Sequence, residues 1–352
     1  MAIRMFLALF AMLLGAAAPT YTPVTPATPI SFPRDHGAHP DFRTEWWYVT
    51  GWLKTDAGEN LGFQVTFFRS KLATDPANPS RFAPRQILFA HAALSDPKAG
   101  KLRHAQRIAR AGFGLAQAST TDTDLVLDDW TLRRRADGNF TTHVAGDGFA
   151  LDLVFTPGQA AILQGDAGYS QKGPDPREAS HYYSLPHLGV GGTLTRDGTP
   201  ATVTGTAWLD REWSSTLLNP RAVGWDWLGL NMDDGGALTL FRVRDKAGAD
   251  VWAGGSYRDK AGRQTKLRPA DVRFRPGRRW RSPRTGALYP VAPQVVVRLN
   301  GSDRVLAITP LFDDQELDSR RGGGPVYWEG AVTVPGGRGY LEMTGYAAPL
   351  KM

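Results

Sequence analysis

The chain has 352 residues, a formal net charge of +7 and no cysteine. This length is sufficient for two domains with sizeable cores, and the missing thiols exclude disulfides, cysteine nucleophiles and cysteine–zinc sites. The basic residues are scattered and form no stripe interleaved with aromatic residues, so we expect no nucleic-acid partner; the charge favours solubility or weak association with an anionic membrane surface. Abundant glycine (39) and proline (25), without long helical repeats, predict a β-rich chain with frequent turns.

The first nineteen residues, MAIRMFLALFAMLLGAAAP, have the pattern of an export signal. Arg4 supplies a positive charge, residues 5–14 are an apolar run too short to span a bilayer, and Gly15 to Ala17 offer small residues for cleavage. The sequence therefore predicts a signal peptide over 1–19 and a periplasmic or extracellular protein. An uncleaved membrane anchor is the alternative.

A proline-rich lead-in over 20–40 precedes the first strands. Alternating apolar residues predict a hairpin of strands over 46–54 and 61–69, in which Trp46, Tyr48 and Trp52 share one face. Further strands are predicted over 86–94, 124–134, 149–155, 161–165, 181–195 and 201–210, with a polar loop over 166–180.

The strand pattern is interrupted near 218–222, where we place a domain boundary. A hairpin follows over 224–245, with its turn at 233–236. Later strands are predicted over 250–258, 292–299, 304–311, 326–334 and 339–346. The chain is thus expected to form two β-rich units, residues 41–218 and 219–352, and the second has the size of one small barrel.

The segment TVTGTAWLDREWSS, residues 202–215, is predicted to form a strand with three consecutive charged residues, Asp210 to Glu212, in its second half. Side chains alternate along a strand, so Trp208 and Asp210 share one face, and Glu212 joins them if the strand continues. Burial beside a tryptophan and a second carboxylate raises a carboxyl pKa, and a carboxylic acid that stays neutral can donate a proton. The alternative is an ordinary ion pair with Arg211 or another arginine at a barrel rim.

The segment SHYYSLPHLGVGG, residues 180–192, places His181 and Tyr183 on one face. A histidine within reach of Asp210 could orient that carboxyl or position water; the alternative is a hydrogen-bonded histidine at a strand edge. The seven histidines are dispersed and no metal-binding spacing occurs, so no metal is expected. Nucleotide and serine-hydrolase motifs are also missing, and we expect no cofactor.

The tryptophans have two interpretations. Most tryptophans of a β-protein fill its core, but some line a ligand cavity where a barrel encloses one. We take Trp47, Trp213 and Trp227, together with Glu212, as candidates for binding a substrate.

Five separated motifs resemble the AttH-like/carotenoid 1,2-hydratase family, whose members are described as lipocalin-like predicted secreted hydrolases. The motifs are DFRTEWWYVTGWL (41–53), YYSLPHLGVGGTL (182–194), GTAWLDREWSS (205–215), GWDWLGLNM (224–232) and the YWEGAV and GRGYLEMTGY pair within 327–346. The resemblance implies an all-β fold of two tandem lipocalin-like (calycin-type) antiparallel β-barrels. It also implies that an aspartic acid protonates an isoprenoid double bond, after which water traps the cation.

The hydratases' site pattern, His-x-Trp followed by aromatic-x-Asp, matches His181, Tyr183, Trp208 and Asp210. In this chain Tyr183 stands in the place of the tryptophan, and Trp208 stands in the place of a tyrosine. The resemblance thus implies a catalytic role for the same aspartate that the strand pattern selects.

Three functions follow from these observations. The first is an exported hydratase-like or hydrolase-like enzyme that uses a protonated Asp210, buried inside the N-terminal barrel, on a hydrophobic small molecule. The second is a carrier of a lipid-like ligand, without catalysis. The third is a structural role in which Asp210 and Glu212 join the two barrels.

Overall fold

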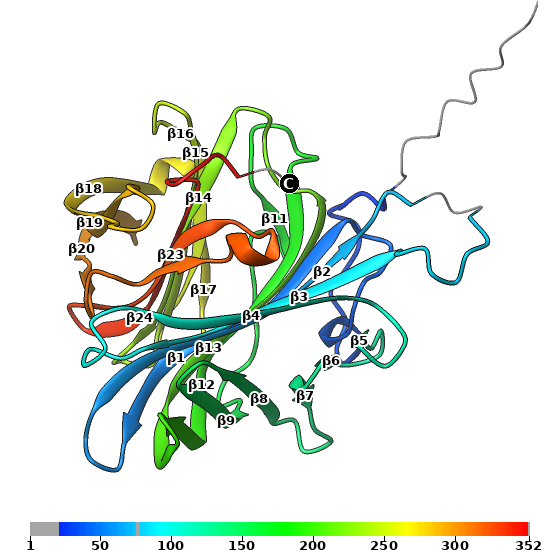
Figure 1. Ribbon diagram of the computed structural model, residues 1–352. Helices are drawn as coiled ribbons and strands as arrows, with labels where there is room; N and C mark the ends of the chain where they lie inside the picture. Colours follow the sequence, from blue (N-terminus) through cyan, green and yellow to red (C-terminus); the bar gives the residue numbers. More distant parts are fainter. Residues whose placement is uncertain (1–20, 75–77, 351–352) are drawn as a thin grey trace, which may run out of the picture.

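The computed structural model describes residues 21–74 and 78–350, so the predicted signal segment, residues 1–19, lies outside the described residues (Figure 1). The all-β prediction is confirmed: the described chain forms antiparallel sheets and short 3₁₀ helices. The helices are η1 (Arg34–His36), η2 (Pro269–Asp271) and η3 (Arg320–Gly322). No helix in the described ranges has the length and apolar character needed to cross a membrane.

The first sheet has 13 strands, in the order β4-β3-β2-β1-β13-β12-β9-β8-β7-β6-β5, with β10 and β11 also paired to β12. Its strands are β1 (Thr44–Thr55), β2 (Asn60–Lys71), β3 (Gln86–Ser95), β4 (Arg103–Arg110), β5 (Ala116–Ala118), β6 (Asp124–Leu127), β7 (Trp130–Arg134), β8 (Phe140–Gly146), β9 (Phe149–Thr156), β10 (Ile162–Leu163), β11 (Tyr169–Gln171), β12 (Ala179–Arg196) and β13 (Thr199–Thr216).

The first sheet curls until β3 and β4 contact β6 and β8, and it encloses a large apolar core. Val49, Phe63 and Phe155 lie in this core and are fully buried. The curl follows from the right-handed twist of a long antiparallel sheet, which brings its edges together.

The second and third sheets form the remainder of the fold. The second sheet contains β14 (Ala222–Met232), β15 (Ala237–Asp245), β16 (Asp250–Arg258), β17 (Gln264–Leu267), β21 (Thr309–Pro310), β22 (Glu316–Asp318), β23 (Val326–Val334) and β24 (Gly337–Thr344). The third sheet contains β18 (Val272–Arg281), β19 (Leu288–Leu299) and β20 (Ser302–Ala307). Leu230, Leu240 and Val295 belong to the core that these two sheets share, so the chain forms the two barrel-like units that were predicted.

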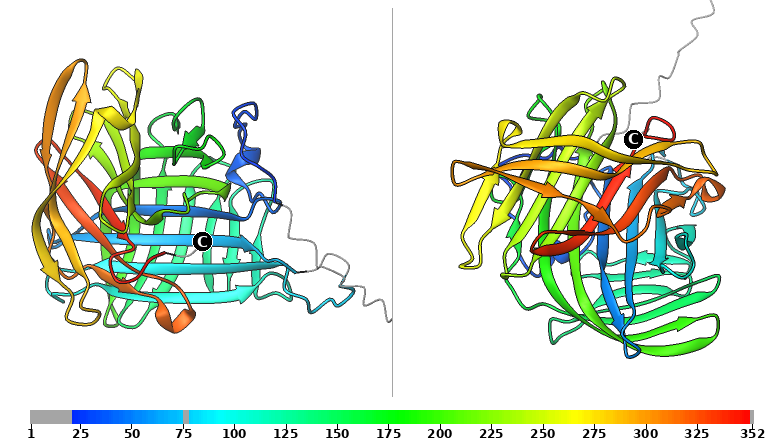
Figure 2. Two further views of the ribbon diagram at one scale, coloured as in Figure 1. Left: turned by 90° about the horizontal axis from the view of Figure 1, so that it is seen from above. Right: turned by 90° about the vertical axis from the view of Figure 1, so that its left-hand side faces the viewer.

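The first and second sheets also pack against each other through their outer faces, and Figure 2 shows the strands of the second unit crossing those of the first at a steep angle. Tyr48, Trp52 and Trp208 from the first sheet meet Trp227 and Tyr340 from the second in a separate buried cluster. Most of β1 and residues 207–214 of β13 are therefore buried on both faces of the sheet, whereas the first half of β13 is largely exposed.

Several sequence predictions are corrected by the structure. Residues 124–134 form two strands, β6 and β7, because Asp128 adopts a left-handed conformation (φ 58°) that turns the chain between them. Strands β4, β8 and β18 were not predicted. β4 carries its charged residues on a half-exposed surface without regular alternation, and in β18 the alternation of Val272 to Arg275 stops after four residues, at Pro276 and Gly277. The lead-in is also not simply extended, since Asp35 and His36 are buried against the first barrel.

Candidate active site

A cavity of about 520 Å³ lies between the first and second sheets. Its lining is mostly aromatic and aliphatic, and it includes Tyr48 and Asp210 from the first sheet and Trp227, Phe241 and Glu342 from the second. The expectation of a pocket inside the N-terminal barrel was wrong, because the apolar core fills that barrel and the hollow lies on the sheet's outer face. A volume and lining of this kind are typical of a small-molecule site.

Asp210 is held on the cavity wall by three hydrogen-bond donors. Tyr182 Oη donates to Oδ2 at 2.5 Å, while Ser184 Oγ and Trp208 Nε1 donate to Oδ1 at 2.5 and 2.6 Å. The carboxyl group is 3% exposed, and no Lys or Arg of the described chain forms an ion pair with it. The alternative of an ion pair with Arg211 is wrong, because Arg211 points to the opposite face and binds Glu45.

Two further side chains fix the orientation of the Tyr182 and Ser184 hydroxyl groups. Trp227 Nε1 donates to Tyr182 Oη at 3.0 Å, and Gln164 Nε2 donates to Ser184 Oγ at 2.8 Å, so both hydroxyl protons are free to point at Asp210. A carboxylate has about four acceptor positions. Three are occupied, and the remaining one is on Oδ2, where the carboxyl proton would be carried.

Burial raises the pKa of Asp210 to about 7, although its three hydrogen bonds lower it, and the nearby Glu212 raises it further. At neutral pH the group is therefore divided between its acid and its carboxylate. That value suits a residue that gives and takes a proton near physiological pH.

Glu212 is the next carboxylate along the same face of β13, and unlike Asp210 it has a cation. Lys172 Nζ lies 3.1 Å from Glu212 Oε1, and Ser180 donates to the same oxygen. The ammonium group of Lys172 also lies 4.5 Å from the ring centre of Tyr182 and 4.3 Å from that of Phe241. The cavity wall thus holds an ionised pair beside the unpaired acid.

The opposite wall contributes a further, partly buried carboxyl group, Glu342, whose Oε1 accepts a hydrogen bond of 2.8 Å from Trp225 Nε1. Glu342 and Glu329 are directly opposite each other on β24 and β23, and Tyr48 from the first sheet donates to Glu329. Burial raises the pKa of Glu342 to about 8, and the negative charges of Asp210, Glu212 and Asp226 raise it further. Burial also raises the pKa of Glu329 well above its ordinary value, and there the neighbouring Glu342 adds to the effect.

Trp227 can face the cavity because its neighbour has no side chain. A Cβ added at Gly229 would lie 2.4 Å from Cη2 of Trp227, so any other residue would displace the indole. The Trp227 ring meets Tyr48 edge-on, with ring centres 5.2 Å apart, and Trp208 at 6.4 Å. These rings form an electron-rich surround for Asp210.

Four predicted site residues, His181, Tyr183, Trp47 and Trp213, lie on the face of β1, β12 and β13 that is opposite to the cavity. His181 is buried against Phe42 and Trp213, and Tyr183 Oη contacts His36 Nδ1 at 2.6 Å. The expectation that His181 lies within reach of Asp210 was therefore wrong. The register decides this, because Ser184 pairs with Asp210 and Tyr182 with Glu212, so Tyr182 and Ser184 lie on the same face as Asp210, and His181 and Tyr183 lie on the other.

Trp47 and Trp213 also point into the first barrel, away from the cavity. The guanidinium carbon of Arg211 lies 3.7 Å from the ring centre of Trp47, and His39 stacks on Trp213 with ring centres 3.9 Å apart. These tryptophans belong to a buried ion cluster at one end of the barrel.

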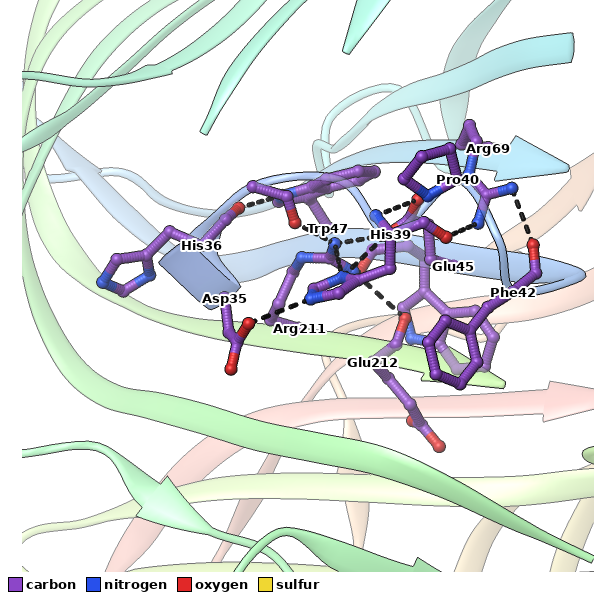
Figure 3. Close-up of polar contacts among 12 residues, drawn as sticks. Asp35, His36, His39, Pro40, Phe42, Glu45, Trp47, Arg69, Arg211 and Glu212 are labelled. Carbon is purple, nitrogen blue, oxygen red and sulfur yellow. Dashed lines mark hydrogen bonds and ion pairs between the residues drawn. The ribbon is translucent and has the colours of Figure 1, made fainter. Parts of the chain in front are cut away.

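The ion cluster is centred on Glu45, which is fully buried (Figure 3). Arg69 Nε binds Glu45 Oε1 at 2.5 Å, Arg211 binds Oε2, and the backbone N–H of His39 lies 3.0 Å from both oxygens. Burial alone would raise the pKa of Glu45, but Arg211, His39 and Arg69 lower it far below the ordinary range. The cluster ties the lead-in to β1, β2 and β13, and Arg211 also donates to the backbone oxygens of the cavity residues Trp46 and Glu212.

Comparison with known proteins identifies the family. The AttH-like family model matches residues 23–346. The chain belongs to the AttH-like family. A crystal structure of a Nitrosomonas europaea protein assigned as AttH is 52% identical to this AttH-like chain, with a TM-score of 0.86, and the match covers 92% of this chain and 99% of that one. Kievitone hydratase from Nectria haematococca shares the fold at 16% identity, with a TM-score of 0.65 and coverage of 94% and 97%. The search of curated proteins gave no match.

Three residues of this AttH-like protein's site were not foreseen: Tyr182 and Ser184, which donate to Asp210, and Glu342, which lines the cavity. Tyr182 and Ser184 could have been found from the sequence only with the register between β12 and β13, which alternation within one strand does not give. Glu342 comes from the last strand, far from Asp210 in the chain. In the described ranges, no group of three or more His, Asp or Glu side chains is arranged to hold a metal ion.

Two substitutions in the AttH-like protein should move the pKa of Asp210 in opposite directions. Glu212→Gln removes a negative neighbour and frees the Lys172 cation, so we expect the pKa to fall, on the order of one pH unit. Tyr182→Phe removes a donor to the ionised form, so we expect the pKa to rise by a similar amount. Carbon-13 NMR titration of labelled aspartate, with Asp210→Asn to assign the resonance, measures both. Shifts in the same direction would contradict the electrostatics described above.

Proposed function

We propose that this protein is a hydratase-type enzyme that adds water across a double bond of an isoprenoid or lipid-like substrate, with Asp210 as the proton donor. The observation that supports this most directly is a buried, unpaired carboxyl group with a pKa of about 7 on the wall of an apolar cavity. An ordinary structural aspartate at this depth would be paired with a cation. The third function considered, a staple between the barrels, has less support, because Asp210 has no cationic partner and Glu212 pairs with Lys172 of the same unit.

The proposed reaction needs only Asp210 and water. The proton on Oδ2 passes to one alkene carbon, and the π electrons form the new C–H bond, which leaves a cation on the neighbouring carbon. A water oxygen bonds to that carbon, and one of its protons returns to the Asp210 carboxylate. The sum is alkene plus water giving alcohol, with the acid restored.

The aromatic walls would stabilise the intermediate cation. The rings of Trp227 and Tyr48 border the cavity near Asp210, and a desolvated cation over an aromatic face gains about 2 kcal/mol. Asp210 and Trp227 are 3% and 7% exposed, so a cation formed beside them would be shielded from bulk solvent.

The test is incubation with a terminally unsaturated isoprenoid in ¹⁸O-labelled water, followed by mass spectrometry. We expect an alcohol that carries one ¹⁸O atom. Recovery of unchanged isoprenoid from the protein in an organic extract, with no alcohol formed, would contradict catalysis and favour the carrier function.

The place of action is a separate part of the proposal. We propose an exported protein, periplasmic or extracellular, on the basis of residues 1–19. Exposed Arg43 and partly exposed Lys71 border the cavity, which favours weak contact with anionic lipid near its opening. The mass of the mature chain tests the removal of residues 1–19.

A further inference from the structure

The cavity has a second polar end, which the proposed chemistry leaves unused. His91 lies on the cavity wall, is 2% exposed, and its Nδ1 is 2.6 Å from Tyr327 Oη. His91 comes from β3 in the first sheet and Tyr327 from β23 in the second, so this contact also joins the two walls.

The strand register fixes the position of His91 relative to Asp210. Asp210 pairs with Tyr48, Tyr48 with Thr66, and Thr66 with His91, so all four lie in one row across the first sheet. Residues that oppose each other in this way point to the same face of the sheet. Three interstrand spacings separate Asp210 from His91, a distance of about 14 Å. A ligand that reaches both must be elongated.

The chemistry at this end is that of a neutral hydrogen-bond donor. Burial lowers the pKa of His91 to about 3, and His104 lowers it further, so the imidazole is uncharged. A phenol is a more acidic donor than a neutral imidazole, so Tyr327 donates to Nδ1 and the ring proton is left on Nε2. Phe68 and Phe89 lie against the ring, with ring centres 5.5 and 6.0 Å from that of His91.

We propose that His91, oriented by Tyr327, binds an uncharged oxygen group of the ligand, a hydroxyl or a carbonyl, at the end of the cavity opposite Asp210. The preferred substrate is then an elongated apolar molecule with a double bond near one end and an oxygen acceptor near the other. A pure hydrocarbon leaves the imidazole N–H without a partner in an apolar site, which is unfavourable. This inference deepens the proposed function, because it gives the class of substrate for the same cavity.

The experiment measures binding and therefore does not depend on whether Asp210 acts as an acid. The probes are farnesol, an acyclic isoprenoid alcohol, and farnesene, a hydrocarbon with the same carbon skeleton. Quenching of tryptophan fluorescence reports on each, since Trp225 and Trp227 border the cavity. For His91→Phe we expect the ratio of farnesol affinity to farnesene affinity to fall by about 3- to 10-fold, the range of one neutral hydrogen bond, with farnesene affinity retained.

Two further variants keep the test decisive. His91→Gln retains an N–H donor and should restore part of the preference for farnesol. Phe89→Leu changes the shape of the same end without changing its polarity, so it should alter the binding of both probes in parallel. An unchanged ratio in His91→Phe, or a wild-type protein that binds neither probe, would overturn the proposal.

Discussion

Asp210→Asn is expected to reduce the rate of water addition by at least about 100-fold while it leaves ligand affinity within a few-fold of the wild type. The amide has the shape of the carboxyl group and still accepts hydrogen bonds, but it cannot release a proton to an alkene. The donors Tyr182, Ser184 and Trp208 all remain in place. Initial rates with the ¹⁸O assay and fluorescence quenching measure the two quantities separately.

The matched comparison is Glu342→Gln, because Glu342 borders the same cavity and also has a raised pKa, of about 8. If Glu342→Gln stops the reaction and Asp210→Asn does not, the proton donor has been assigned to the wrong wall. If neither substitution affects the rate, neither of the two cavity carboxyl groups with a raised pKa is the acid.

The rate of water addition should also fall at alkaline pH. Asp210 donates its proton only while protonated, so the rate should fall as the pH rises through about 7.

The raised pKa of Asp210 also makes the free energy of unfolding depend on pH, because the folded state holds this proton at pH values where the unfolded chain has released it. The stability that this proton contributes is complete below about pH 4 and is lost as the pH rises through about 7.

Glu45→Gln is expected to lower the free energy of unfolding by about 3–5 kcal/mol, because it leaves Arg69 and Arg211 buried without their counter-charge. Both guanidinium groups are at most 2% exposed, so water cannot replace the lost carboxylate. Urea unfolding measures the loss as a shift of the midpoint, provided that the slope of the free energy of unfolding against urea concentration does not change.

The control for Glu45→Gln is Asp197→Asn, which breaks an ion pair with Arg103 at the surface, where the Asp197 side chain is 67% exposed. That substitution should cost less than about 1 kcal/mol. Equal losses of free energy of unfolding in the two variants would mean that burial does not determine how much these ion pairs contribute to stability. Because the pKa of Glu45 is lowered on folding, its contribution is present above about pH 4.5 and is lost as the pH falls further.

Much of the fold was predictable because strand periodicity is local. The hairpin of β1 and β2, the hairpin of β14 and β15 and the shared face of Trp208 and Asp210 all follow from alternation within a few residues. The arginine-rich strand β18 was not predictable in this way, since its alternation ends after Arg275, and the arginines beyond Pro276 and Gly277 are exposed.

The candidate site was predicted in part. Asp210 follows from its position among apolar residues of β13, but its partners depend on the register with β12 and on packing between sheets. A shift of one residue exchanges Tyr182 for Tyr183, and the sequence carries no local signal that distinguishes them. The facing wall, with Trp227 and Glu342, comes from a different sheet, and no periodicity within a strand indicates which sheet covers it.

The division of the cavity between two sheets has an engineering consequence. The three groups that hold Asp210 all come from β12 and β13, whereas much of the opposing surface comes from β14, β15, β23 and β24. Within the described chain, the backbone passes between the two units once, after Thr216. A chimera joined at this point would take the second unit, and with it half of the cavity wall, from a relative. Its substrate selectivity could then change while the first unit, which holds Asp210, keeps its sequence.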